Sequence, residues 1–240
     1  MRALLLDAGN SSVKVAIWEG KELEVFLRLP TREVLKEPER LVEELRGVRA
    51  SKIVVASVVK EVSKVVKENF HGALFVSADL KLPINIDYKR PDLLGADRIA
   101  IACGGLEFAE SFIAVSCGTA TVVDVVEERT FKGGIIFPGL GTMAESLNLK
   151  TSQLPKVQPE SEINVPGKST KECIKAGILL STVGGIKEVI RRFPNCKVLI
   201  TGGWGRVINK HLQGSYIPDL PLIGLKKIAE VVKGGETPPH

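Results

Sequence analysis

The sequence predicts an α/β protein made of two related halves, and three observations support this fold class. Apolar strand segments alternate with amphipathic helices, which is the order expected of a parallel sheet covered by helices. Each half opens with an apolar run, a glycine turn and a second apolar run, at residues 3–18 and 112–126. The strand at residues 52–57 also resembles residues 197–202, in the same order along the chain. The two halves therefore indicate an internal duplication.

The first glycine turn is Asp7-Ala8-Gly9-Asn10-Ser11-Ser12, after a strand apolar enough to be buried on both faces. The bend at Gly9 and Asn10, followed by a second β-type run, predicts a hairpin. Its backbone N–H groups and two hydroxyls converge on one spot, which suits a phosphate. Asp7 could hold a metal ion or its water there. The same residues are also compatible with an ordinary turn that binds nothing.

The second glycine turn repeats the first at a constant spacing. Its residues are Ser116-Cys117-Gly118-Thr119-Ala120-Thr121, and they again lie between two apolar runs. A nucleotide in the cleft between the halves, with one hairpin of each half on its phosphates, would account for the duplication. The matched pairs are Gly9 with Gly118, Asn10 with Thr119, and Ser12 with Thr121.

The remainder of the first half reads as alternating strands and helices. Pro38 is a favourable first helical residue. Residues 83–90 are extended, and a helix over residues 96–108 carries Asp97 and Arg98 in its first turn. Those two side chains are also compatible with a helix-start acid and a surface ion pair. The other expected elements are strands at residues 23–29, 53–56 and 73–76, and a helix whose apolar face comprises Val58, Val59, Val62, Val65 and Val66.

The second half contains the longest predicted helix, which follows Ser169. Ser169 and Glu172 form a capping-box pattern at its start. Residues 151–168 are rich in Pro, Ser and Gln and read as a loop, and a loop of this length is usually functional or mobile. The remaining expected elements are a strand at residues 130–137, a helix at 142–149, a strand at 198–200 that ends in Thr201-Gly202-Gly203, a helix at 222–232, and a frayed tail at 234–240.

Composition excludes several functional classes. The 240 residues are 44% hydrophobic and 25% charged, as in an ordinary globular protein. The net charge of +5 is mild, and the mixed charges do not indicate a nucleic-acid partner. No apolar stretch predicts a membrane span, no leader segment is recognised, and the four cysteines form no C-x-x-C pair, so we expect a reduced, cytoplasmic protein. Three histidines leave no zinc cluster.

Seven short motifs occur in a fixed order along nearly the whole chain. They are Asp7-x-Gly9-Asn10-Ser11-x-x-Lys14, Tyr88-x-x-Pro91-x-x-Leu94-Gly95-x-Asp97-Arg98, Gly118-Thr119-Ala120-Thr121, Gly133-Gly134-x-Ile136-x-Pro138-Gly139, Thr151-x-x-Leu154-Pro155, Thr170 with Gly177, and Thr201-Gly202-Gly203. Together they resemble the type III pantothenate kinases, a family in the superfamily of actin, the sugar kinases, acetate kinase and the large heat-shock chaperones.

The resemblance implies an actin-like ATPase fold with two duplicated ribonuclease-H-like lobes and the nucleotide in the cleft between them. Residues 1–110 would form the N-terminal lobe, with the first phosphate hairpin and the acceptor segment. Residues 111–240 would form the C-terminal lobe, with the second hairpin, a dimerisation helix and the adenosine turn. The implied activity is ATP-dependent phosphorylation of pantothenate. The implied ATP-binding residues are Asp7, Ala8, Gly9, Asn10, Ser11, Ser12, Val13, Lys14, Gly118, Thr119, Thr121, Gly202 and Gly203.

The resemblance also assigns the acceptor site and the metals. Asp97 would be the general base, Arg98 would bind the pantothenate carboxylate, and Mg²⁺ would lie near Asp7, directly or through water. A homodimer is implied, in which Thr170 reaches the partner's site. The family has Asp, associated with K⁺ or NH₄⁺, where this chain has Ser116, a much poorer cation ligand. The other substrate-binding residues implied are Tyr88, Gly95 and Ala96.

Two further interpretations fit the same motifs. One is a kinase for another small carboxylate or a sugar, because Arg98 and Tyr88 favour a carboxylate without identifying it. The other is a non-catalytic regulator on the same fold. Retention of four motif residues argues against it: Asp7, Lys14, Asp97 and Thr119. A chaperone-type ATPase is disfavoured because 240 residues leave no peptide-binding domain.

Overall fold

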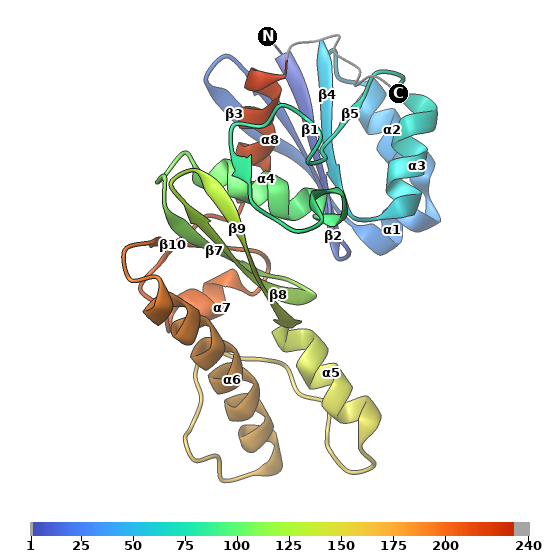
Figure 1. The fold of residues 1–240 in the computed structure, drawn as a ribbon. Helices are drawn as coiled ribbons and strands as arrows, with labels where there is room; N and C mark the ends of the chain where they lie inside the picture. Colours follow the sequence, from blue (N-terminus) through green and yellow to red (C-terminus); the bar gives the residue numbers. More distant parts are fainter. Residues whose placement is uncertain (1, 233–240) are drawn as a thin grey trace. The chain divides into compact units, whose positions relative to one another are not determined.

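The computed structural model describes residues 2–232, so the tail expected at residues 234–240 lies outside it (Figure 1). The chain divides into two compact units. The first contains residues 2–108, Arg129–Phe131 and residues 219–232. The second contains Ala109–Glu128 and Lys132–Pro218. We describe each unit by itself.

The first unit is built on a five-stranded sheet in the order β3-β2-β1-β4-β5. Strands β1, β2 and β3 are antiparallel neighbours, whereas β4 and β5 run parallel to β1. The predicted first hairpin is confirmed, with Asp7 opposite Lys14. The strands are β1 (Arg2–Ala8), β2 (Ser12–Glu19), β3 (Glu22–Pro30), β4 (Lys52–Ser57) and β5 (Leu74–Phe75).

Helices cover both faces of this sheet, which explains the continuous apolar run in β1 (Figure 1). Leu4 and Leu6 share a core with α1 (Thr31–Lys36), α2 (Pro38–Arg46) and α3 (Lys60–Asn69). The opposite face packs against α4 (Ala96–Gly105) and α8 (Leu220–Val231). The sequence gives no sign of the six-residue α1. Val58 does not join the apolar face of α3 as expected: it lies before the helix and is 36% exposed.

The close approach of α4 and α8 places the last helix in the first unit, whereas the sequence predicts a single boundary near residue 110. A Cβ atom built on Gly224 would overlap the Ala100 carbonyl oxygen, and one built on Gly104 would overlap the Leu220 carbonyl oxygen. These two glycines therefore allow the helix backbones to touch. The short β6 (Asn85–Ile86) and the 3₁₀ turn Pro91–Leu93 precede α4.

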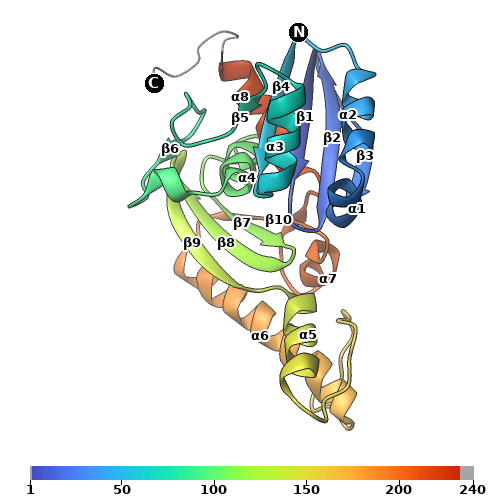
Figure 2. The same ribbon diagram turned by 90° about the vertical axis from the view of Figure 1, so that its right-hand side faces the viewer.

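The second unit contains the strands β11-β10-β7-β8-β9 in that order, with the second predicted hairpin formed by β7 and β8. Figure 2 shows α6 along one face of this sheet. The first residues of β9, Thr130 and Phe131, pair with β6 and belong to the first unit. The elements are β7 (Phe112–Cys117), β8 (Ala120–Glu127), β9 (Thr130–Pro138), α5 (Leu140–Lys150), α6 (Thr170–Arg192), β10 (Lys197–Thr201), α7 (Gly205–Asn209) and β11 (Ser215–Tyr216).

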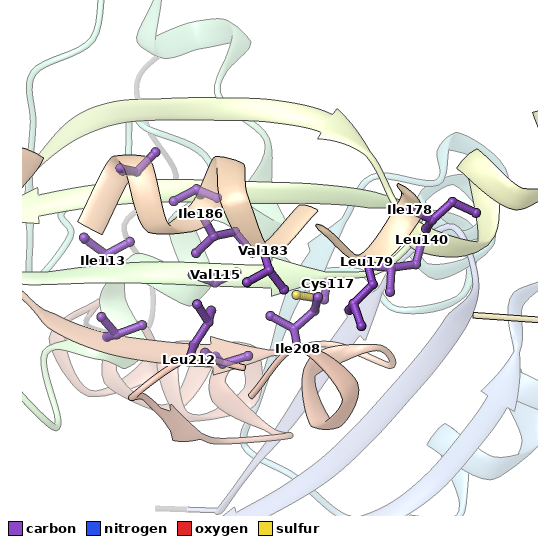
Figure 3. Close-up of a cluster of buried hydrophobic side chains, with 14 of the residues drawn as sticks. Ile113, Val115, Cys117, Leu140, Ile178, Leu179, Val183, Ile186, Ile208 and Leu212 are labelled. Atoms are coloured by element: carbon purple, nitrogen blue, oxygen red, sulfur yellow. The ribbon is translucent and has the colours of Figure 1, made fainter. Parts of the chain in front are cut away.

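The core of the second unit lies between α6 and the sheet (Figure 3). Ile178, Leu179 and Val183 of α6 are buried there against β7 residues that include Ile113 and Val115. The sequence correctly predicts this long helix and its N-cap. The Ser169 hydroxyl accepts the Glu172 N–H, but the Glu172 carboxylate accepts the Lys168 N–H rather than the Ser169 N–H of a full capping box.

The residues between α5 and α6 form the predicted loop. Side-chain contacts hold this loop against the rest of the second unit. Val157 is buried in the core. Glu160 pairs with Lys175 of α6 at 2.6 Å, and the Ser161 hydroxyl accepts Lys210 Nζ at 3.0 Å. The loop therefore packs as a defined part of the second unit.

Among residues 2–232, no helix combines the length and apolar content needed to cross a membrane. The four cysteines within this range are free thiols.

Candidate functional site

The turn of the first hairpin is held in place by backbone bonds and by α1. The Gly9 N–H donates to the Ser12 carbonyl at 3.0 Å. Thr31 begins α1, and its hydroxyl donates to the Gly9 carbonyl at 2.6 Å while its N–H donates to the Ser11 carbonyl at 3.1 Å. The predicted phosphate turn is therefore anchored from outside the hairpin, by a residue that the sequence analysis does not single out.

The predicted ATP residues of this turn divide by burial. Asn10 and Ser11 are exposed, and Ser12 is half-buried. The side chains of Ala8 and Val13 are buried in the core, which leaves only their backbone atoms for a ligand. Most of the polar groups at this turn are therefore accessible.

Asp7 is the most perturbed acid of the first unit. Burial raises its pKa to about 6; the positive charge of Lys14 opposes this rise, whereas the charges of Asp97 and Asp219 add to it. These electrostatic effects require Lys14, Asp97 and Asp219 each to lie near Asp7. The structure therefore brings together Asp7, Lys14 and Asp97, which the sequence predicts as site residues, and adds Asp219, which it does not.

Asp97 and Arg98 lie in the first turn of α4, as expected. The Asp97 carboxylate accepts the Arg98 N–H at 2.8 Å, and burial raises its pKa despite that bond and the Arg98 charge. A Cβ atom built on Gly95 would lie 2.6 Å from Asp97 Oδ1. Gly95 is therefore required by the position of the Asp97 carboxylate. Ala96 between them is the first residue of the helix.

Arg98 lies beside two aromatic rings of the first unit. Its guanidinium carbon is 5.6 Å from the Tyr88 ring centroid and 5.3 Å from that of Phe131, and the two rings meet edge to face. Arg98 is only 8% exposed, whereas Tyr88 is 37% exposed. The contact of Phe131 with Arg98 could not be predicted, because a buried Phe at the start of a strand carries no local sign of a distant partner.

The second unit holds the other predicted ATP residues around its own hairpin. The Gly118 N–H donates to the Ala120 carbonyl at 2.9 Å, and the Thr119 carbonyl accepts the Gly139 N–H at 2.9 Å. Thr119 O also accepts the Thr142 hydroxyl at 2.7 Å, a contact with no sequence signal. The Thr121 hydroxyl is buried and has no hydrogen-bond partner among the described residues.

The predicted adenosine turn contacts this second hairpin. Gly202 has a φ of 89°, and a Cβ atom there would lie 2.5 Å from the Cys117 carbonyl oxygen. Gly203 is exposed with open space around it. Ser116 is half-buried on β7, in register with Thr201 of β10. Thr170 is the exposed first residue of α6.

Known structures with a similar fold show which fold class the chain has. The structure is similar to a ROK hexokinase from Thermus thermophilus, with a TM-score of 0.50, 14% identity and coverage of 95% of this chain and 97% of that one. A Campylobacter jejuni protein described as a Baf family transcriptional activator matches with a TM-score of 0.66, 20% identity and coverage of 95% and 97%. The chain thus has the actin-like fold of the sugar kinases, in agreement with the sequence prediction.

The sequence comparisons identify the family. The model of the family described as type III pantothenate kinase matches residues 3–192. A type III pantothenate kinase from Aquifex aeolicus is 36% identical over 234 residues, covering 95% of this chain and 97% of that protein. The chain belongs to the type III pantothenate kinase family, as its motifs predict.

Proposed function

We propose that this protein transfers the γ-phosphoryl group of ATP to the hydroxyl of pantothenate, giving 4′-phosphopantothenate in coenzyme A biosynthesis. The observation that carries the proposal is in the first unit, where a carboxylate with a raised pKa, Asp97, adjoins a buried and permanently charged arginine, Arg98. Asp7 lies opposite Lys14 in the first hairpin, and the charges of Lys14 and Asp97 act on the pKa of Asp7. An acid, a carboxylate receptor and a phosphate turn are what a kinase for a small carboxylate requires.

Phosphoryl transfer depends mainly on positioning and charge neutralisation. We propose that the first hairpin binds ATP phosphate through its turn N–H groups and Lys14. We also propose Gly118, Thr119 and Thr121 as the ATP-binding residues of the second unit. The unpartnered Thr121 hydroxyl supports this, because a buried hydroxyl gains from a ligand that bonds it. Gly202 and Gly203 would lie against the adenosine.

Asp7 fits the Mg²⁺ that ATP carries. Its carboxylate is partly buried beside two other acids, and a divalent cation relieves the unfavourable charge that raises its pKa. Residues 2–232 contain no group of three or more His, Cys, Asp or Glu that could enclose a metal. Mg²⁺ typically uses one or two carboxylates, waters and substrate phosphates, so this donor set suits it. When bound, it would neutralise phosphate charge.

We assign the proton transfer to Asp97 and the recognition of the substrate carboxylate to Arg98. A pKa raised by burial makes Asp97 a stronger base when it is ionised. The planar guanidinium of Arg98, held against Tyr88 and Phe131, presents its N–H groups in a fixed orientation. Tyr88, which remains partly exposed, would then cover the bound substrate.

The test of the function is ADP release with ATP, Mg²⁺ and pantothenate, each omitted in turn. We expect ADP only when all three are present. Equal release without pantothenate would indicate a plain ATPase. ADP release with another small carboxylate or with a sugar, but not with pantothenate, would identify a different acceptor substrate. No ADP release with any acceptor would favour a regulator.

Replacing Gly95 by Ala tests the geometry of the base. The added methyl group meets only the flexible end of the Asp97 side chain, so we expect the thermal stability to change little. The displaced carboxylate should lower kcat by about tenfold or more, because small misplacements of reacting groups are costly. The measurement is kcat beside the melting temperature. An unchanged kcat would show that Asp97 keeps its function after moving.

Ser116 leads to a prediction about monovalent cations. A carboxylate at this position would repel the phosphates unless a cation accompanied it. With Ser116 the carboxylate is absent, and if its cation is absent too, the local charge is the same as with both present. We propose that the enzyme needs little K⁺ or NH₄⁺ and that Ser116→Asp creates such a need. Activity is compared in Na⁺, K⁺ and NH₄⁺ at equal ionic strength. Tenfold activation of the unmodified enzyme by K⁺ would refute the compensation.

We further propose a cytoplasmic homodimer, in which Thr170 of one chain completes the site of the other. Family membership supports the dimer. So does the exposed side of α6, where Leu180 is 49% exposed and where Gly177 and Gly184 have open space around them, which would let another helix pack closely. The free thiols are consistent with a reducing compartment. Sedimentation at assay concentration checks the dimer, and a fully active monomer would exclude it.

A further inference from the structure

Asp219 stands at the position before α8, yet its carboxylate does not cap the helix. An Asp at this position ordinarily accepts an N–H from the second or third helical residue. Here the second residue is Pro221, which has no N–H, and the Asp219 side chain makes no capping bond. The carboxylate instead accepts Arg28 Nη2 with both oxygens at 2.8 Å and lies 3.5 Å from Lys14 Nζ.

The sheet register explains why a carboxylate is needed there. Lys14 lies opposite Asp7 on one side and opposite Arg28 on the other, so three charged residues form a row across β1, β2 and β3. Two cations opposite each other on antiparallel strands repel. Asp219 reduces this repulsion because its carboxylate contacts both cations.

The same contact orients Lys14. A lysine side chain is flexible, and its ammonium group is a point charge that adopts many positions when it is not held. The Lys14 side chain is only 16% exposed and that of Asp219 only 25%. Arg28, 48% exposed, fixes the Asp219 carboxylate through a two-oxygen contact.

We infer that Asp219 is a positioning residue for phosphate binding, one that holds the Lys14 ammonium at the first hairpin with the help of Arg28. The inference rests on the proposed function, in which Lys14 contacts ATP. Whether ATP binding becomes weaker or stronger when Asp219 is replaced distinguishes positioning from a simple charge effect. By charge alone, removing an acid near the phosphates should strengthen ATP binding, whereas the loss of positioning should weaken it.

The test measures the affinity for Mg·ATP and the steady-state constants of Asp219→Ala and Asp219→Asn. We expect Asp219→Ala to raise the KM for ATP by about tenfold, with KM for pantothenate unchanged and kcat reduced less than about threefold. Asp219→Asn should lose less ATP affinity, because its amide oxygen can still accept a hydrogen bond from one of the two cations. Tighter ATP binding in both variants would overturn the inference in favour of a charge effect.

A double-mutant cycle with Lys14→Ala separates positioning from folding. In the Lys14→Ala background, Asp219→Ala should change Mg·ATP affinity by less than about twofold. An equal loss in both backgrounds would contradict the inference. Glu107→Ala serves as the structural control, since it breaks the 2.6 Å pair between Glu107 and Lys227 of α8 without touching the hairpin, and it should leave ATP affinity unchanged.

The outcomes also separate this inference from the proposed function. If the enzyme binds ATP but does not phosphorylate pantothenate, the cycle is run on binding alone and still decides the role of Asp219. If pantothenate is phosphorylated and Asp219→Ala has no effect on ATP affinity, the inference fails while the function stands. A protein that binds no ATP overturns both.

Discussion

Asp97→Asn is expected to lower kcat by roughly 10²–10⁴-fold, the largest effect on activity that we predict. Asparagine keeps the size of the side chain and an oxygen that can accept the Arg98 N–H, which the carboxylate binds at 2.8 Å. It cannot take the proton of the attacking hydroxyl. Binding of pantothenate should persist, because Arg98 remains in place.

Stability provides the first control for this variant. Burial raises the pKa of Asp97 in the folded protein. An acid with a raised pKa favours folding below its unfolded-state pKa, and this contribution is lost as the pH rises through the folded-state pKa. At pH 8 the ionised Asp97 therefore disfavours folding, and Asp97→Asn should hold or raise the melting temperature. A variant that loses activity only because it unfolds would instead have a lower melting temperature.

Asp92→Asn provides the second control. Asp92 is an exposed acid of the turn before α4, paired with Arg90 at 2.6 Å. Its replacement makes the same chemical change close to the site and should leave kcat within about twofold, as surface substitutions usually do. If the kcat of Asp97→Asn stayed within a fewfold of the unmodified enzyme, Asp97 would not be the base.

Gly224→Ala is expected to be the most destabilising small substitution in the first unit. The added methyl group would overlap the Ala100 carbonyl oxygen and approach the Gly104 N–H at 2.9 Å, and both are backbone atoms that no rotamer change can move away. The two helices must separate, which costs about 1–3 kcal/mol or more. We expect the melting temperature to fall by roughly 2–4 °C per kcal/mol.

The matched control is Gly47→Ala. Gly47 has right-handed helical angles, φ −63° and ψ −15°, and a Cβ atom there would meet nothing closer than 3.5 Å. Its replacement should leave the melting temperature unchanged or slightly higher, because alanine lowers the entropy of the unfolded chain. Equal stability of Gly224→Ala and Gly47→Ala would mean that the contact between α4 and α8 relaxes without cost.

Much of the candidate site could be predicted because its signals are local. A glycine turn between two apolar runs specifies a hairpin within a few residues, and the structure contains both hairpins at matched positions. The start of α4 likewise places Asp97 and Arg98 in one turn. Their chemical roles come from the family pattern, since an acid and an arginine at a helix start are otherwise unremarkable.

The sequence by itself determined the α/β class, the two hairpins, the long helix α6 and the family motifs, because each depends on residues that are close along the chain. Only the tertiary structure decided that α8 returns to the first unit, that Phe131 packs on Arg98, and that Asp219 contacts Lys14. These contacts join residues far apart in the sequence. Periodicity and turn chemistry report which face of an element is apolar or which residue bends the chain. Which surfaces meet depends on how the buried faces pack, and a local pattern does not contain that information.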